Sequence, residues 1–252
     1  MSQLTDKDFW DIKYEVEKGR LTISGMRLYL LGVFLYSTFI LGVSIYAATA
    51  NTVGWSNLHE GWHIVFYMEA VMFAVNIILL LLCWGKNAFT QKLLTIALVI
   101  YTYKIALDPF LVILLASKDR GIYQFYAPVV LIIICMGFVV HVGWLLTKIY
   151  DLKREKVKNK ETTNPKLKSI ILITIIFFLV IVAGQVIKSG VMKDMELAFI
   201  LAIATIVFIT MLLGAVEYLI ALYCIFYFPS FSVNPPPVQN YTNKKRRKKK
   251  KR

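Results

Sequence analysis

The sequence has few charged residues, and little of the histidine and cysteine that metal centres need. Only 17% of the 252 residues are charged, and the 15 Asp and Glu are outnumbered by 29 Lys and Arg. A soluble domain is usually about one quarter charged, so a soluble fold is not favoured. The three cysteines, Cys83, Cys135 and Cys224, have neither paired nor metal-type spacing. We interpret them as small buried side chains.

The motifs of several enzyme classes are absent as well. The sequence contains no glycine-rich phosphate loop, no C-x-x-C pair and no nucleophile elbow of the G-x-S-x-G type. Nucleotide-dependent, thioredoxin-like and α/β-hydrolase chemistries therefore find no support.

Long apolar runs make up most of the chain. Apolar residues account for 58% of it, and six runs are long enough to cross about 30 Å of hydrocarbon at about 1.5 Å per residue. We therefore predict an all-α integral membrane protein, a six-transmembrane-helix bundle over residues 28–228. The predicted spans are residues 28–49, 62–84, 93–117, 126–148, 169–188 and 197–228.

Basic residues are distributed unevenly over the segments that connect the runs. Of the 29 Lys and Arg, 24 fall on the side of the N-terminal segment, and Lys104 lies within a span. Only Lys118, Arg120, Lys188 and Lys193 fall on the opposite side. This positive-inside bias predicts that the N- and C-termini both lie in the cytoplasm and that the protein is a multi-pass protein of a cell membrane. The Ile- and Lys-rich composition suggests that this membrane is the cytoplasmic membrane of a bacterium. The competing interpretation is a signal peptide cleaved near Ala48-Thr49-Ala50, but the apolar run is longer than such peptides have.

Little of the chain lies outside the predicted bundle. Residues 1–27 are predicted to form a cytoplasmic segment with a short interfacial helix over residues 5–18, capped by Thr5. The alternation around Lys18-Gly19-Arg20 also fits a hairpin. Residues 229–252 are predicted to form a disordered, polybasic cytoplasmic tail.

The tail carries nine consecutive basic residues. Beside a membrane span, such a run attracts anionic lipid at the cytoplasmic face, and we expect this to be its main contact. Non-specific nucleic-acid binding and a dilysine retrieval signal are alternatives, whereas specific nucleic-acid binding is not favoured. The run comprises Lys244, Lys245, Arg246, Arg247, Lys248, Lys249, Lys250, Lys251 and Arg252.

The sharpest local motif is His59-Glu60-Gly61-Trp62-His63, an H-E-x-x-H sequence. On a helix, its two histidines lie one turn apart and can share a zinc ion, with the glutamate as general base on the bound water. The motif resembles that of zincin-type metalloproteases, which implies His59 and His63 as metal ligands and Glu60 as the catalytic base. Against this, Gly61 weakens a helix, and no third ligand follows at a recognised spacing. Acidic residues on the same side that could supply one are Asp119, Asp194 and Glu196.

A helix start explains the same residues without a metal. Asn57 precedes Glu60 by three residues, which is a capping pattern for the second span. Trp55 and Trp62 lie at the height where an aromatic belt is expected. We favour this interpretation, which involves no cofactor, and retain zinc as the alternative.

Five ionisable residues fall inside predicted spans. A charge at the bilayer centre costs about 2.5 to 3.5 kcal/mol on insertion scales, so each should face protein or water. Lys104 and Asp108 share a helix face and should pair, and Pro109 predicts a kink beside them. Ordered by depth, the five residues could form a ladder that conducts a proton or an ion across the membrane. Alternatively, Lys104 and Asp108 form a purely structural pair, and Glu217 is an interfacial glutamate. They are Glu69, Lys104, Asp108, His141 and Glu217.

Two function hypotheses of different classes follow. The first is a non-enzymatic polytopic membrane protein that moves a small ion or solute, or that serves as an accessory subunit of a larger membrane complex such as a secretion or transport assembly. Its partners would be the lipid bilayer with its anionic lipids, and another membrane protein or a second copy of the chain. The second hypothesis is a zinc-dependent membrane hydrolase that uses the motif at residues 59–63.

Overall fold

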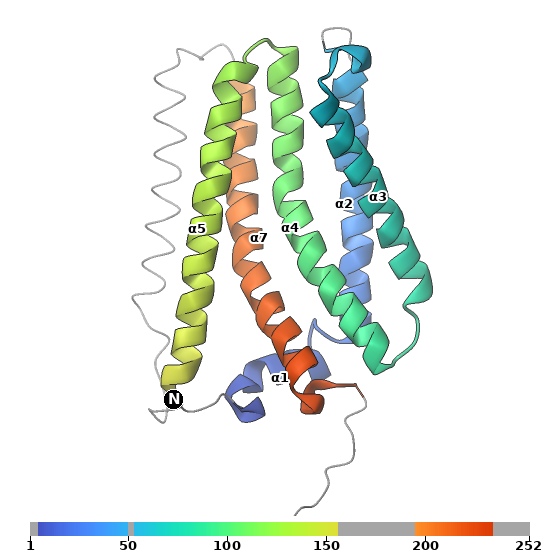
Figure 1. Ribbon diagram of the computed structural model, residues 1–252, viewed down its shortest axis with the longest axis vertical. Coiled ribbons are helices and arrows are strands. Elements are labelled where there is room, and N and C mark those ends of the chain that lie inside the picture. The colour runs from blue at the N-terminus through green and yellow to red at the C-terminus, as the bar shows by residue number, and fades with distance from the viewer. Residues whose placement is uncertain (1–4, 50–52, 156–194, 234–252) are drawn as a thin grey trace, which may run out of the picture.

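The computed structural model describes residues 5–49, 53–155 and 195–233 (Figure 1). The predicted fifth span, residues 169–188, and the basic run, residues 244–252, lie outside the described residues.

Five long apolar helices run side by side through the described part of the chain (Figure 1). The shortest, α3, has 23 residues and is therefore about 34 Å long at about 1.5 Å per residue, enough to cross a bilayer. These helices coincide with five of the six predicted spans, and several extend beyond the predicted boundaries. They are α2 (Ile23–Thr49), α3 (Glu60–Leu82), α4 (Ala88–Asp119), α5 (Tyr123–Glu155) and α7 (Met195–Tyr227).

Helices α2 to α5 alternate in direction along the chain, whereas α7 runs in the same direction as α5 (Figure 1). Arg120, directly after α4, forms an ion pair of 2.9 Å with Glu196 at the start of α7, so these two points lie at one end of the bundle. Leu152, near the end of α5, lines the same cleft as Ile220 of α7, at the other end. α5 therefore ends at the opposite end of the bundle from the one where α7 begins.

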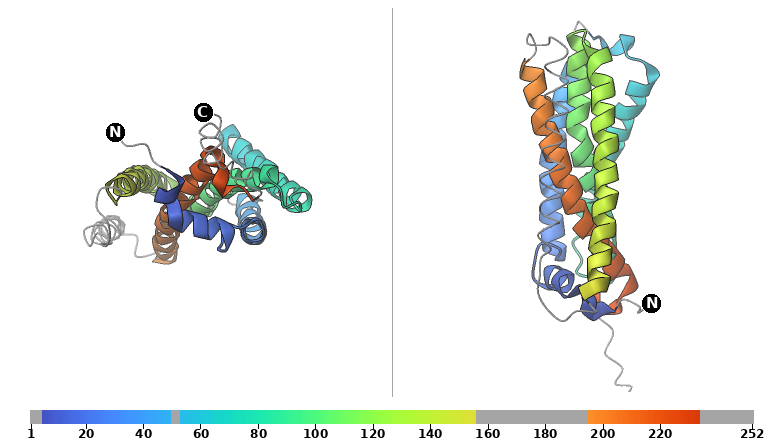
Figure 2. Two further views of the ribbon diagram at one scale, coloured as in Figure 1. Left: turned by 90° about the horizontal axis from the view of Figure 1, so that it is seen from below. Right: turned by 90° about the vertical axis from the view of Figure 1, so that its left-hand side faces the viewer.

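α4 is the central helix of the bundle (Figures 1 and 2). In its most apolar stretch 61% of the residues are buried, against 11% for α3, which packs mainly on α2. Large side chains from neighbouring helices interlock around α4, and the rings of Phe110 and Phe208 meet edge to face at 5.3 Å. Between helices in lipid, such close packing is a main source of stability.

α4 passes through Pro109 without a break, but its two halves run in different directions (Figure 1). Proline has no N–H to donate to the carbonyl four residues earlier, that of Ile105. The hydroxyl of Tyr36, from α2, donates to this carbonyl instead, at 3.4 Å. A neighbouring helix thus satisfies the backbone group that the proline leaves without its helical partner.

A short helical segment lies across the end of the bundle where α2 begins and α7 ends (Figure 2). It consists of a 3-10 turn, η1 (Asp6–Phe9), and α1 (Trp10–Glu17). The backbone N–H of Thr5 donates to the Asp8 carboxylate at 2.7 Å, which caps the turn. Phe9 is buried, with its ring 5.6 Å from that of Phe228. The segment is helical and does not form the alternative hairpin, and its contact with a leaflet remains a prediction.

The close approach of α5 to α7 depends on one glycine. A Cβ at Gly137 would lie 2.1 Å from Cε1 of Phe208, so Gly137→Ala should force that buried ring to move. Overpacking of this kind typically costs about 1 to 3 kcal/mol, and we expect a lower unfolding temperature in detergent. Gly143→Ala is the matched control, because a Cβ there meets nothing within 4 Å. Equal unfolding temperatures for the two variants would contradict the packing assigned to Gly137.

Candidate functional site

The polar centre of the bundle is built on one face of α4. Lys104 and Asp108 are four residues apart, so they lie one above the other on that face. The Nζ atom of Lys104 is 2.7 Å from Oδ2 of Asp108. Both side chains are almost completely buried, with 6% and 2% of their surface exposed. The pair that the spacing predicts is therefore present.

A second carboxylate approaches the same ammonium group. Oε2 of Glu69, from α3, lies 2.6 Å from Nζ of Lys104, and the Glu69 side chain is 18% exposed. The three charges form a cluster that carries a formal charge of −1 when all are ionised. We call Glu69, Lys104 and Asp108 the charge cluster.

Polar groups of α2 complete the surroundings of the charge cluster. Lys104 Nζ also lies 3.4 Å from the Ser37 hydroxyl, which is buried. Tyr36, one residue earlier, bridges to the α4 backbone at Ile105. Neither contact could be predicted from the sequence, because a single serine or tyrosine in an apolar run is common. The signal that could have indicated these contacts is a hydroxyl side chain in another span at the depth of Lys104.

His141 lies apart from the charge cluster, in a junction between α4, α5 and α7. Its Nδ1 atom is 2.8 Å from the carbonyl oxygen of Leu212, and its Nε2 atom is 2.7 Å from the Tyr103 hydroxyl. Because a carbonyl only accepts, Nδ1 donates to it, and in the neutral ring Nε2 then accepts from the Tyr103 hydroxyl. Tyr103 and Lys104 are adjacent in α4 and therefore point about 100° apart. Of the five intramembrane residues, three therefore meet in the charge cluster, and His141 lies on another side of α4.

Glu217 forms an ion pair at the end of the bundle where α1 lies. Its carboxylate contacts the guanidinium of Arg20, from the loop that precedes α2. Both side chains are about half exposed. The predicted five-residue ladder is therefore not continuous: three residues meet, and His141 and Glu217 each have other partners.

The H-E-x-x-H motif straddles the start of α3. His59 is the N-cap residue, with extended backbone angles, and its Nδ1 accepts a hydrogen bond from the backbone N–H of Gly61 at 3.1 Å. Glu60 is the first residue of the helix, and the His63 ring packs against Trp55 with centroids 4.6 Å apart. A zinc site of this motif needs both histidines on one helical face, and here only His63 lies in the helix. Within residues 5–49, 53–155 and 195–233, no three His, Cys, Asp or Glu side chains gather to hold a metal ion.

The capping role of His59 leads to a test that separates it from metal binding. His59→Ala should lower the free energy of unfolding by about 1 kcal/mol, because the cap is lost, whereas His59→Asn should preserve it. Thermal unfolding and metal analysis of the purified proteins check both outcomes. Stoichiometric zinc in the wild type that disappears in both variants would reverse this assignment in favour of the zinc alternative.

Comparisons with protein-family models, with curated proteins and with solved structures find no match for this chain.

Proposed function

We propose that this polytopic membrane protein moves a proton or a small monovalent cation across the bilayer, with the charge cluster as its mid-membrane binding site. Lys104 lies at the middle of the 32-residue helix α4. Charged groups at this depth are costly in lipid, and in spans they commonly mark an ion or proton pathway.

The observation that carries the proposal is the second carboxylate. One carboxylate is enough to neutralise Lys104, and a buried pair of that kind can be purely structural. Here Asp108 and Glu69 both contact its Nζ atom, at 2.7 and 2.6 Å. A net negative charge is energetically unfavourable in a poorly hydrated site, so the charge cluster favours uptake of a proton or a cation. A site that gains and loses such a charge is what a carrier requires.

Flux measurements test this proposal directly. The purified protein is reconstituted into vesicles that contain a pH-sensitive dye, and gradients of protons, sodium or potassium are imposed in turn. We expect dye or tracer movement well above that of protein-free vesicles for at least one cation. Flux at the level of protein-free vesicles under every gradient would overturn the transport proposal.

An accessory role in a larger membrane complex is the second candidate. α3 presents most of its surface away from the other described helices, although it contributes Glu69 to the charge cluster. A helix of a partner or of a second copy could cover this surface. Mass measurement of the intact complex in mild detergent distinguishes the two roles, because a co-purifying partner favours the accessory one. The zinc hydrolase has no comparable support in the part of the chain that the structure describes.

The charge distribution supports the orientation we propose, with both termini in the cytoplasm. Reporter fusions at Asn57 and Asp119 should then signal from outside, and those at Asn87 and Asn240 from the cytoplasm. Alkaline phosphatase and fluorescent-protein activities report the two sides. A cytoplasmic signal at Asn57 would reverse the orientation.

A further inference from the structure

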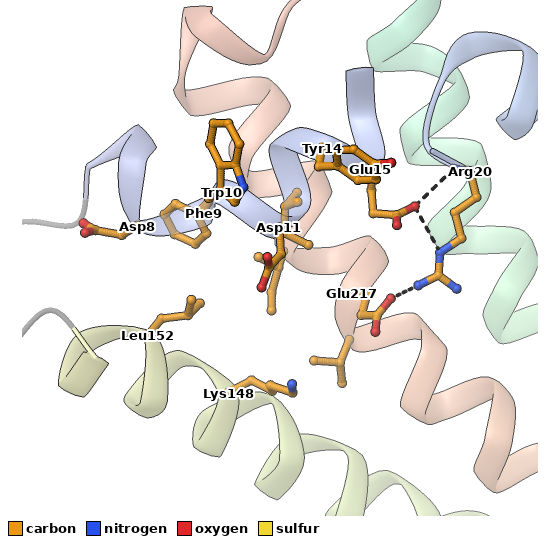
Figure 3. A pocket seen from close by; sticks show the side chains of 13 residues that line it. Asp8, Phe9, Trp10, Asp11, Tyr14, Glu15, Arg20, Lys148, Leu152 and Glu217 are labelled. Carbon is orange, nitrogen blue, oxygen red and sulfur yellow. Dashed lines mark hydrogen bonds and ion pairs between the residues drawn. The ribbon is translucent and has the colours of Figure 1, made fainter. Parts of the chain in front are cut away.

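A mixed-charge cleft lies between α1, α5 and α7, at the end of the bundle where Glu217 lies (Figure 3). Its volume is about 880 Å³, which is large enough for several side chains. The cleft shares no residue with the charge cluster. Its charged lining residues are Asp8, Asp11, Glu15, Glu217, Arg20 and Lys148.

The lining has more acidic than basic side chains, and the guanidinium of Arg20 is already paired with carboxylates. The Arg20 guanidinium contacts Glu217 and lies 3.7 Å from Glu15. Lys148 Nζ lies over the Trp144 ring, 5.9 Å from its centroid. The carboxylate of Asp11 points into the cleft from α1 (Figure 3). Four carboxylates against two cations leave a formal charge of −2, which favours a cationic occupant.

The chain that leads to the basic run is anchored beside η1, the turn that contributes Asp8 and Phe9 to the cleft. The Gln91 side chain donates to the Phe231 carbonyl at 3.0 Å and accepts from the backbone N–H of Val233 at 2.9 Å. The Ser230 hydroxyl lies 3.1 Å from the Asp6 carboxylate, two residues before Asp8 of the lining. Gln91 is buried, and we call its two hydrogen bonds to Phe231 and Val233 the clamp. The clamp holds residues 231–233 at a defined place on the bundle.

The length of the intervening chain is sufficient. Residues 234–243 separate the clamp from the basic run. Ten residues can span at most about 33 to 36 Å, whereas the eight residues of α1 measure about 12 Å. Every carboxylate along α1 is therefore within reach of the run.

We propose that the basic run Lys244–Arg252 docks in this cleft, where its side chains pair with the lining carboxylates. Docking holds α1 against α5 and α7. It also withdraws the run from anionic lipid, the partner that its composition alone favours. The proposal does not depend on the transport function.

Zero-length carbodiimide cross-linking of the full chain tests the proposal, because it joins lysine amines to carboxylates in direct contact. The protein is reconstituted in zwitterionic vesicles, and the cross-linked peptides are identified by mass spectrometry. We expect intramolecular cross-links from tail lysines to Asp8, Glu15 and Glu217. Asp11→Asn should lower the yield at these three other carboxylates about three- to fivefold, the factor that one exposed ion pair typically supplies.

Glu17→Gln is the matched control, since it removes the same charge from α1 outside the cleft and should leave the yields unchanged. The proposal is overturned if tail lysines react equally with Glu17, react only between molecules, or do not react. Cross-links from the lysines of residues 156–168 in place of the tail would overturn it too. In vesicles that contain an anionic phospholipid, we expect the cross-links to persist. Their loss there would assign the run to lipid and exclude the cleft as its site.

Discussion

Replacing Lys104 by Met is expected to destabilise the protein by about 3 to 5 kcal/mol, the typical cost of leaving a buried charge without its partner. The change removes the ammonium group that lies 2.7 Å from the Asp108 carboxylate and 2.6 Å from that of Glu69. Methionine fills a similar volume, so the loss reflects charge and not a cavity. Thermal unfolding of the purified protein in detergent measures the effect. Lys13→Met is the control, because Lys13 belongs to a partly exposed pair on α1 that contributes at most about 1 kcal/mol.

Rescue by further substitution shows whether the three charges act as a unit. The double variant Lys104→Met with Asp108→Leu still leaves the Glu69 carboxylate without its cation, so we expect only partial recovery of the unfolding temperature. Adding Glu69→Gln removes the last charge and should restore stability to near that of the wild type. Equal damage in the single, double and triple variants would show that the residues are not coupled.

The sequence predicted contacts within one helix better than contacts between helices. Lys104 and Asp108 follow from the periodicity of α4, and the structure confirms their pairing. Ordering by depth placed Glu69 in the same ladder as Lys104 and Asp108, but its ion pair with Lys104 depends on how α3 is rotated. Rotation is set by packing against neighbouring helices, which a single sequence does not specify. The predicted bend at Pro109 was likewise local, while the hydroxyl of Tyr36 that satisfies the freed carbonyl came from another helix.

The same limit explains the parts of the predicted site that the structure separates. His141 lies at a suitable depth for a proton path, but the Leu212 carbonyl and the Tyr103 hydroxyl already engage both ring nitrogens. Glu217 has its partner, Arg20, in a segment that precedes the first span. Depth orders residues along the membrane normal, whereas direction around the helix decides which of them meet. In the H-E-x-x-H motif, the helix begins at Glu60, one residue after His59, so the two histidines do not share a helical face. Helix ends are the least certain part of a sequence-based prediction.

Glu69→Gln is expected to abolish cation flux while leaving the protein at least as stable as the wild type. Glutamine keeps the size and shape of the side chain but removes the surplus negative charge. The remaining pair, Lys104 with Asp108, is neutral and keeps its 2.7 Å contact, so we expect no loss of folding stability. Flux into reconstituted vesicles and thermal unfolding in detergent are measured on the same preparation. Glu217→Gln is the control, because it removes a carboxylate outside the charge cluster and should leave flux intact.

The combination of the two measurements distinguishes a carrier site from a structural pair. If Glu69 only supports packing, its loss should lower the unfolding temperature and the flux together. If it is the group that accepts the proton or cation, stability and flux should separate, because the charge matters for exchange and not for folding. A Glu69→Gln protein that carries cations as fast as the wild type would show that the surplus carboxylate takes no part in exchange. The charge cluster would then be a structural element of the bundle, and the site of any transport would have to lie elsewhere.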